Sequence, residues 1–314
     1  MLLLVKLKFS RAIQIGVGES PYGQEFSGVI HSDTLFSGIV NQWVRISDDK
    51  STKQFISDMQ HDPPCLTLSS AFPYIFDEYY LPTPYDTGGL YAEKLKEIPF
   101  LELSDFIDLA HGAFERIGSK PLRNPLPRLM SRFVSPRVTI DRINTSTNIF
   151  EERGSMIREG AGLYFLIELK DTALKDKMEL CIRLLGESGI GGDRSIGFGQ
   201  FEPEFVRADD VPDWANLFKQ KLDDHTYYTL SLCCPKDAKE AKEAISYAIL
   251  PRDGWTFSNS STKQMKRRTC RMFSEGSLFR RALVGKLADV TPTDFRPEHS
   301  VYRYGLGMMI EMVV

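Results

Sequence analysis

An α+β fold of two domains is predicted for this chain from three observations. With 314 residues, the chain is long enough for two domains. Its 42% of hydrophobic residues is enough to bury a core. Up to residue 210, the expected segments run strand, helix, two strands, helix, strand. That is the order of a ferredoxin-like domain.

The first segments of this domain, 1–210, have clear signals. The apolar run at 2–9 predicts a strand, and residues 66–72 predict another. The stretch 31–46 predicts a helix that Ser32 or Asp33 would cap. Its apolar residues recur at helical spacing: Leu35, Ile39, Val40 and Trp43.

The middle of the domain is expected to carry an insertion, about 81–165. Residues 81–136 are rich in proline and predict mostly loop, with one helix at 104–117. Residues 137–143 alternate like an exposed strand. Residues 147–169 predict a long β-hairpin.

A helix at 173–186 and a strand through Phe198, Phe201 and Phe205 complete the first domain. A second, β-rich ferredoxin-like domain is expected over 211–314. There, 227–234 predicts a strand and 238–250 predicts a helix with Ile245 inward, and further strand-like segments follow.

The loop at 189–199 holds five glycines around Arg194 and Ser195. It lacks both the GxGxxG spacing of dinucleotide-binding loops and the GxxxxGK[ST] pattern of P-loops. A tight turn needs only one or two glycines, so we expect the loop to hold a sugar–phosphate backbone. Phe198 is expected to pack inward rather than stack on a base. The first-choice RNA contacts are Gly191, Gly192, Arg194, Ser195, Gly197 and Gly199.

The net charge of −3 argues against a chain that coats itself in nucleic acid, but its basic residues concentrate in two stretches. Residues 116–158 hold nine basic and three acidic residues, and 263–286 hold eight basic and one acidic. These stretches indicate a localised polyanion track, the alternative being ordinary solvated charges. The start of the first helix is a further candidate, because helix N-terminal amides attract phosphate. The candidate RNA contacts from these regions are Arg137, Arg142, Arg153, Lys266, Arg268, His31 and Ser32.

The five cysteines show no CxxC spacing, and no histidine lies at ligand spacing from them. They indicate neither a zinc site nor a disulfide framework, and we expect no metal and no cofactor. No stretch approaches 18 apolar residues. A cytoplasmic chain without a membrane segment is therefore expected.

Six segments together resemble one family. The stretch GIGGDRSIGFGQFE resembles the G-rich loop of the RAMP superfamily of CRISPR proteins. The segment HSDTLFSGIV resembles the first-helix motif of the fourth-subunit family of the type III-A (Csm) effector complex. Further segments of that family are matched in the same order: PRVTIDRIN with NIFEE, RDGWTFSNSS, FSEGSLF and ADVTPTDFRPEHSVYRYG.

This resemblance implies a non-catalytic subunit that grips the repeat-derived 5′ tag of the guide RNA. It also implies two protein partners, the large polymerase-like subunit and the backbone RAMP subunit, and a thumb formed by the inserted hairpin. The alternative within the superfamily is a guide-processing endoribonuclease, with His31 as the one early histidine well placed to act as a base. A nuclease role for Asp33 is disfavoured, because no second carboxylate is linked to it by spacing. A protein-only scaffold is the third possibility.

Overall fold

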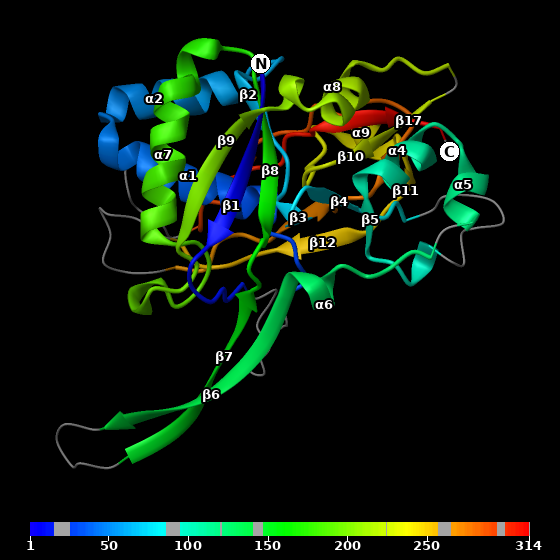
Figure 1. The fold of residues 1–314 in the computed structure, drawn as a ribbon. Helices are drawn as coiled ribbons and strands as arrows, with labels where there is room; N and C mark the ends of the chain where they lie inside the picture. Colours follow the sequence, from blue (N-terminus) through cyan, green and yellow to red (C-terminus); the bar gives the residue numbers. More distant parts are fainter. Residues whose placement is uncertain are drawn as a thin grey trace.

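The computed structural model describes residues 1–15, 26–85, 95–119, 121–140, 147–223, 225–256, 265–293 and 299–313. These residues form a body of helices and antiparallel sheets, from which one long β-hairpin projects (Figure 1). The predicted α+β class, with its glycine-rich loop and inserted hairpin, is confirmed.

A seven-stranded sheet forms the centre of the body. Its strand β1 (Leu2–Phe9) lies antiparallel between β8 (Ala161–Leu169) and β9 (Phe201–Arg207). Five of the eight residues of β1 and eight of the nine residues of β8 are buried, as expected for strands that are covered on both faces. Short strands extend the sheet beyond β8: β2 (Leu66–Leu68), β3 (Phe72–Ile75), β4 (Glu78–Pro82) and β5 (Phe100–Glu102).

Three helices lie together beside this sheet (Figure 1). They are α1 (Ser32–Ile46), α2 (Asp49–Met59) and α7 (Lys175–Ser188). α1 and α7 approach closely at Gly38, where a Cβ atom would lie 2.9 Å from Cδ1 of Leu185. The helices predicted at 31–46 and 173–186 are confirmed, whereas α2 was not predicted.

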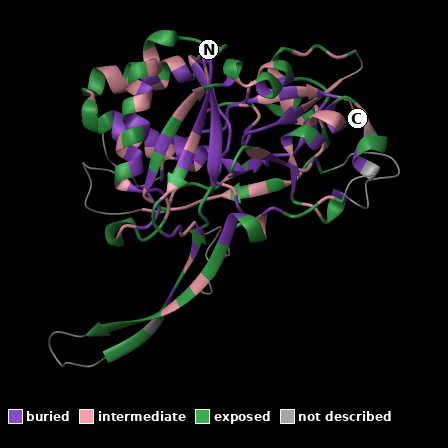
Figure 2. Cartoon of the chain, viewed as in Figure 1, coloured by how far each residue is buried: buried purple, intermediate pink, exposed green. Residues whose placement is uncertain are grey.

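The projecting hairpin consists of β6 (Met130–Ile140) and β7 (Thr147–Ile157). The predicted hairpin at 147–169 is wrong, because its second arm is β8 and belongs to the central sheet. The apolar run at 161–169 is buried in that sheet, while β6 and β7 are largely exposed (Figure 2). Of the exposed strand predicted at 137–143, residues 137–140 form the outer part of β6, and 141–143 lie outside the described residues.

The segment before the hairpin contains more helix than expected. The helix predicted at 104–117 is split into α4 (Leu103–Ala110) and α5 (Phe114–Ser119), and α6 (Leu126–Leu129) leads into β6. Gly112 ends the first of these helices with a φ of 72°. That conformation favours glycine and stops helix propagation.

The C-terminal part forms a four-stranded sheet and two strand pairs. The sheet has the order β11 (Ala244–Ser246), β14 (Leu278–Phe279), β10 (Thr226–Thr229), β17 (Met309–Met312). The pairs are β12 (Ile249–Arg252) with β13 (Cys270–Phe273), and β15 (Ala288–Asp289) with β16 (Tyr302–Arg303).

The helix predicted at 238–250 is wrong beyond its first turn. α9 (Ala238–Lys242) ends after five residues, and the chain continues as β11 and β12. Ile245, Tyr247 and Ile249 occupy alternate exposed positions. Alternation with β-branched and aromatic residues is typical of a strand, so Ile245 points outward rather than inward.

One hydrophobic core runs through both parts of the chain. Trp214, from α8 (Pro212–Lys219), is fully buried, and its ring centroid lies 5.6 Å from that of Tyr164. The backbone amide of Leu68 donates a hydrogen bond to the hydroxyl of Tyr304 (2.6 Å). The domain boundary expected near residue 210 falls within this continuous core, and the division into two domains stays a prediction. The remaining short turns are η1 (Thr172–Leu174), η2 (Arg194–Ile196) and η3 (Ala208–Asp210).

Candidate nucleic-acid interface

The glycine-rich loop joins α7 to β9 and is held against the segment that follows β1. The amide of Gly192 donates to the carbonyl of Gln14, and the amide of Gly199 donates to the carbonyl of Ala12, both at 2.7 Å. These bonds fix the two ends of the loop. Residues 193–196 form its exposed tip.

Two of the glycines are required by close backbone contacts. At Gly199, with φ 71°, a Cβ atom would lie 1.9 Å from the carbonyl oxygen of Ile190. At Gly191, with φ 97°, it would lie 2.5 Å from the carbonyl oxygen of Gln14. Both glycines therefore shape the loop, which is the role that a tight turn would give them.

The amides of the loop are less free than the sequence suggests. The amide of Gly197 donates to the carbonyl of Arg194 (3.0 Å), and those of Gly192 and Gly199 are also occupied. Apart from the amide of Gly191, the free donors of the described loop lie at the tip. Among the described residues, the amides of Asp193, Arg194 and Ser195 donate to no acceptor.

The tip has the backbone shape and charge of an anion site. Asp193 has a φ of 50°, and the 3₁₀ turn η2 follows it, so successive amides converge as in an anion-binding nest. The Arg194 guanidinium and the Ser195 hydroxyl are exposed and have no partner within the part of the chain that the structure describes. The Asp193 carboxylate offsets part of this charge, so Arg194 decides whether the tip attracts phosphate.

The base of the hairpin is attached to the same segment. Ile13 and Ser155 form an isolated antiparallel bridge. The ring of Phe198, inside the loop, contacts the ring of Phe133 edge-on, with centroids 6.3 Å apart. Phe198 is buried, which confirms that it packs inward. Loop and hairpin thus form one surface.

Two hairpin arginines predicted to contact RNA, Arg137 and Arg153, are ion-paired. Nε and Nη2 of Arg137 donate to Oε2 of the buried Glu152 (3.0 and 2.8 Å). Nη2 of Arg153 donates to Oε2 of Glu151 (2.6 Å). The exposed Arg153–Glu151 pair contributes only about 0–1 kcal/mol, so phosphate can replace Glu151. Arg137 is held more firmly, because its release would leave the buried Glu152 carboxylate unpaired. Arg142 lies outside the described residues.

Arg11 is a candidate that sequence reasoning missed. It is exposed and directly precedes Ala12, which holds the loop. Its side chain has no partner among the described residues. It lies two residues after the end of β1 and outside both basic stretches, so the sequence holds no pattern that marks it.

His31 and Ser32 lie in the interior. Nδ1 of His31 is 2.9 Å from Oε1 of Glu275, and the amide of Leu232 donates to the hydroxyl of Ser32 (3.1 Å). The C-terminal part therefore covers the start of α1. Both residues are buried, so we remove them from the candidate interface.

Asp33 holds α1 to the C-terminal part. Arg252 donates to both carboxylate oxygens at 2.9 Å, and Arg303 also pairs with Asp33. Burial raises the pKa of the fully buried Asp33 carboxyl, but the two guanidiniums outweigh it and hold this pKa well below its usual range. Asp33 is thus an ion-pair centre. The predicted cap is wrong, because His31 is the N-cap residue of α1.

Lys266 and Arg268 are exposed in the C-terminal part. Nη2 of Arg268 donates to the carbonyl oxygen and Oδ1 of Asp289 (3.0 and 3.2 Å). Lys266 forms an isolated strand bridge with Trp255. The role of this second basic region in RNA binding stays a prediction.

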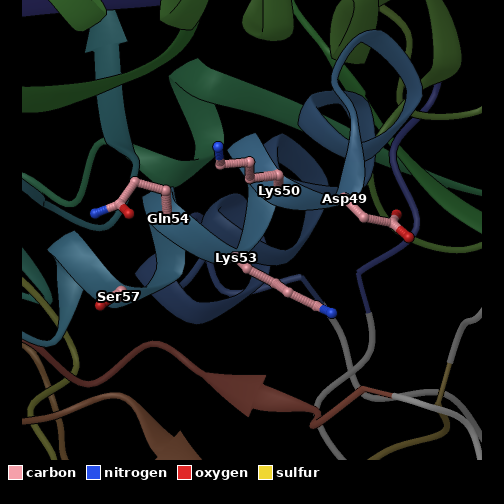
Figure 3. Close-up of a pocket in the computed structure, with 5 residues that line it drawn as sticks. All are labelled: Asp49, Lys50, Lys53, Gln54 and Ser57. Carbon is pink, nitrogen blue, oxygen red and sulfur yellow. The ribbon is translucent and has the colours of Figure 1, made fainter.

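Neither a metal centre nor the hollow on α2 provides a further candidate site within the described residues. Among the described residues, no three His, Cys, Asp or Glu side chains are grouped to hold a metal ion. A shallow hollow on α2 is lined by exposed side chains that point away from one another (Figure 3). These are Asp49, Lys50, Lys53, Gln54 and Ser57.

Across the described residues, no helix is both long and apolar enough to span a membrane.

Residues 222–312 match the model of the CRISPR Csm4 C-terminal domain. The chain is 27% identical over 297 residues to the "CRISPR system Cms protein Csm4" of Thermococcus onnurineus, covering 90% of this chain and 91% of the relative. It is 25% identical over 299 residues to the Csm4 protein of Streptococcus thermophilus, covering 90% and 91%.

Solved structures share the fold. A chain of the Csm3–Csm4 subcomplex of the type III-A CRISPR–Cas interference complex matches with a TM-score of 0.66 at 19% identity, covering 99% of both chains. A chain of the Csm1–Csm4 cassette in complex with cA4 matches with a TM-score of 0.62 at 22% identity, covering 99% of this chain and 97% of the other.

Proposed function

This chain belongs to the Csm4 family of RAMP-type CRISPR proteins, and from that premise we propose that it binds guide RNA without cutting it. The bound segment is the repeat-derived 5′ tag. The protein also joins the large polymerase-like subunit to the backbone subunit of a type III-A effector complex in antiviral defence. Cytoplasmic location, expected from the cysteines, stays a prediction.

The tip of the glycine-rich loop carries the RNA-binding proposal. Three free amides, one hydroxyl and the Arg194 guanidinium are exposed together at residues 193–195. Such a set can grip a phosphate by charge-assisted hydrogen bonds without reading a base. Arg11 adds a second unpaired cation beside the loop.

The hairpin extends this surface as a thumb. On one of its faces, exposed aliphatic residues follow each other outward, and Val138 lies directly opposite Ile149. These residues are 55–77% exposed: Val134, Val138, Ile140 and Ile149. A rigid apolar ribbon that projects beside a phosphate site is suited to wedge against the guide and kink it.

The proposal that the subunit is not a nuclease rests on how its two candidate acid–base groups are bound. The Asp33 carboxylate is enclosed by Arg252 and Arg303. His31 is paired with the buried Glu275 and is 8% exposed. Neither group is placed on an open RNA-binding surface.

The partner proposal rests on the fold shared with chains from the Csm1–Csm4 and Csm3–Csm4 assemblies. Co-purification with the large and backbone subunits from the same genomic locus tests it. Recovery of the chain with neither subunit contradicts the bridging role.

Gel shifts with tagged and untagged guide RNA across a salt series test RNA binding. We expect tighter binding of tagged RNA and a steep salt dependence, because phosphate contacts release counterions. A shallow slope with weak binding favours the protein-only scaffold. Incubation with repeat RNA in the absence of metal tests the alternative, and specific cleavage would establish the processing endoribonuclease.

A further inference from the structure

The chain from Ala244 to Arg252 forms an open edge of the C-terminal part. Among the described strands, β11 pairs only with β14, and β12 pairs only with β13. One side of each strand therefore presents backbone groups that no neighbouring strand covers. Such an edge is a template for another strand.

Apolar side chains line this edge at alternate positions. Ile245, Tyr247 and Ile249 are 42%, 50% and 50% exposed, and Pro251 is exposed as well. We call these four residues the edge stripe. The bands of exposed and half-buried residues along β12 are visible in Figure 2.

The edge stripe is held rigidly from behind. Arg252, at the end of β12, is bound to the buried Asp33. The ring of Tyr247 contacts the ring of Phe273 edge-on, with centroids 5.2 Å apart. A surface that keeps its shape without a partner loses little entropy when it binds one.

The chemistry of the edge stripe favours protein over RNA. Two of its four residues are isoleucine and only Tyr247 is aromatic. Single-stranded RNA is held mainly by stacking on aromatic side chains, whereas isoleucine packs against other apolar side chains and favours strand pairing. An open edge with alternating apolar residues matches recognition by strand addition.

Basic residues border the edge stripe. Arg271 lies directly opposite Pro251 on β13 and is exposed. Arg280 is also exposed, and its amide donates to the carbonyl of Glu243 (2.8 Å), next to β11. This border favours acidic residues on the partner, and it disfavours a second copy of the chain, because two such edges would bring like charges together.

We infer that the edge stripe docks an extended segment of another protein subunit of the effector complex, with apolar residues at alternate positions and acidic residues beside them. The inference rests on the proposed bridging function. Four side chains are fewer than the roughly 20–30 residues per side of a standard interface. The edge stripe is therefore one anchor within a larger contact.

The test uses the double variant Ile245→Lys with Ile249→Lys in the full chain. Both positions are exposed, so the variant should melt like the wild type. Leu180→Lys on α7 is the matched control, because Leu180 is 47% exposed and lies away from the edge. Affinities for the purified large subunit, the purified backbone subunit and guide RNA are measured separately by biolayer interferometry.

We expect the double variant to bind one of the two subunits at least tenfold more weakly and to bind guide RNA as before, with the control unchanged. Hydrogen exchange at 244–250 should slow when that subunit is added to the wild type. Unchanged binding of both subunits by the double variant overturns this inference and leaves the proposed function intact. Loss of RNA binding alone assigns the edge to RNA. A wild type that binds RNA but neither subunit refutes the bridging role itself.

Discussion

Ile13 and Ser155 exchange two backbone hydrogen bonds, 2.8 Å and 2.9 Å long. They join the segment after β1 to the base of the hairpin. The neighbours of Ile13 in the chain, Ala12 and Gln14, accept hydrogen bonds from the glycine-rich loop. The segment is therefore bonded to the loop through its even-numbered residues and to the hairpin through Ile13. Hairpin and loop are therefore held together as one unit.

Replacing Arg194 with alanine should weaken guide-RNA binding about tenfold, because a charge-assisted contact contributes about 1.5–3 kcal/mol where it is desolvated. The slope of log affinity against log salt should also fall by about one, since one phosphate contact is lost. Fluorescence anisotropy with tagged guide RNA measures both. Arg207→Ala is the matched control, because Arg207 is exposed on β9 away from the loop. Equal effects of the two variants would contradict a specific role for Arg194.

Gly199→Ala and Gly197→Ala should differ although both glycines have positive φ. A Cβ atom at Gly199 would lie 1.9 Å from a backbone oxygen, whereas at Gly197 the nearest atom is Oε1 of Gln200 at 3.6 Å. The Gly197 variant should lose only about 1–2 kcal/mol of unfolding free energy, from the strained backbone. The Gly199 variant should lose more and should also bind RNA less tightly, because the loop must shift. Urea unfolding and anisotropy measure the two effects, and equal losses would contradict this account.

Local sequence signals predicted part of the central sheet. The strand expected at 66–72 is β2 followed by the start of β3, the strand expected through Phe198 begins only at Phe201, and β4 and β5 were not predicted. The apolar runs at 2–9 and 161–169 are strands because each buries both faces, and the periodic residues of α1 and α7 are buried as expected. The predicted strand pairing was wrong where a strand could pair with either of two neighbours. Residues 147–157 carry a strand pattern that suits either neighbour, and only the three-dimensional structure shows that they pair with 130–140.

The sequence predicted where the candidate site lies, but not which of its groups are free to bind. The glycines marked the loop, yet four of their five amides are used within the chain, two of them in contacts with Ala12 and Gln14 that the sequence does not reveal. His31 and Ser32 looked accessible because sequence cannot show that a segment some 200 residues away covers them. Arg11 was missed because a single charge has no pattern.

Cys270 should be the most reactive half-buried thiol. Its Sγ lies 3.6 Å from that of Cys234, and this hydrogen bond, with nearby Arg303 and Lys286, lowers the pKa of Cys270 below its usual value. Burial raises the pKa of Cys65 to about 11. Because the thiolate is the nucleophile, iodoacetamide should label Cys270 faster than Cys65 at neutral pH. Timed alkylation with peptide mass spectrometry measures both sites. Equal labelling at neutral pH would contradict the thiol contact.

Asp33→Asn should destabilise the protein by about 3–5 kcal/mol at pH 7, because it leaves two guanidiniums without their buried carboxylate. The matched control is Asp289→Asn. Asp289 is half-exposed in its pair with Arg268, so this change should cost under about 1 kcal/mol. Urea unfolding at fixed pH compares the two variants.

The contribution of Asp33 to the stability of the protein should decrease in acid. The pKa of Asp33 in the folded chain lies below its unfolded value of about 3.9, so its contribution is fully present above about pH 4 and is lost as the pH falls through the folded pKa. The unfolding free energy of the Asn variant should not show this loss at acid pH. If Asp33 instead served catalysis, its replacement would abolish an RNA cleavage that the wild type performs and would leave stability nearly unchanged. Unfolding curves from pH 7 to pH 3, together with a cleavage assay, separate the two roles.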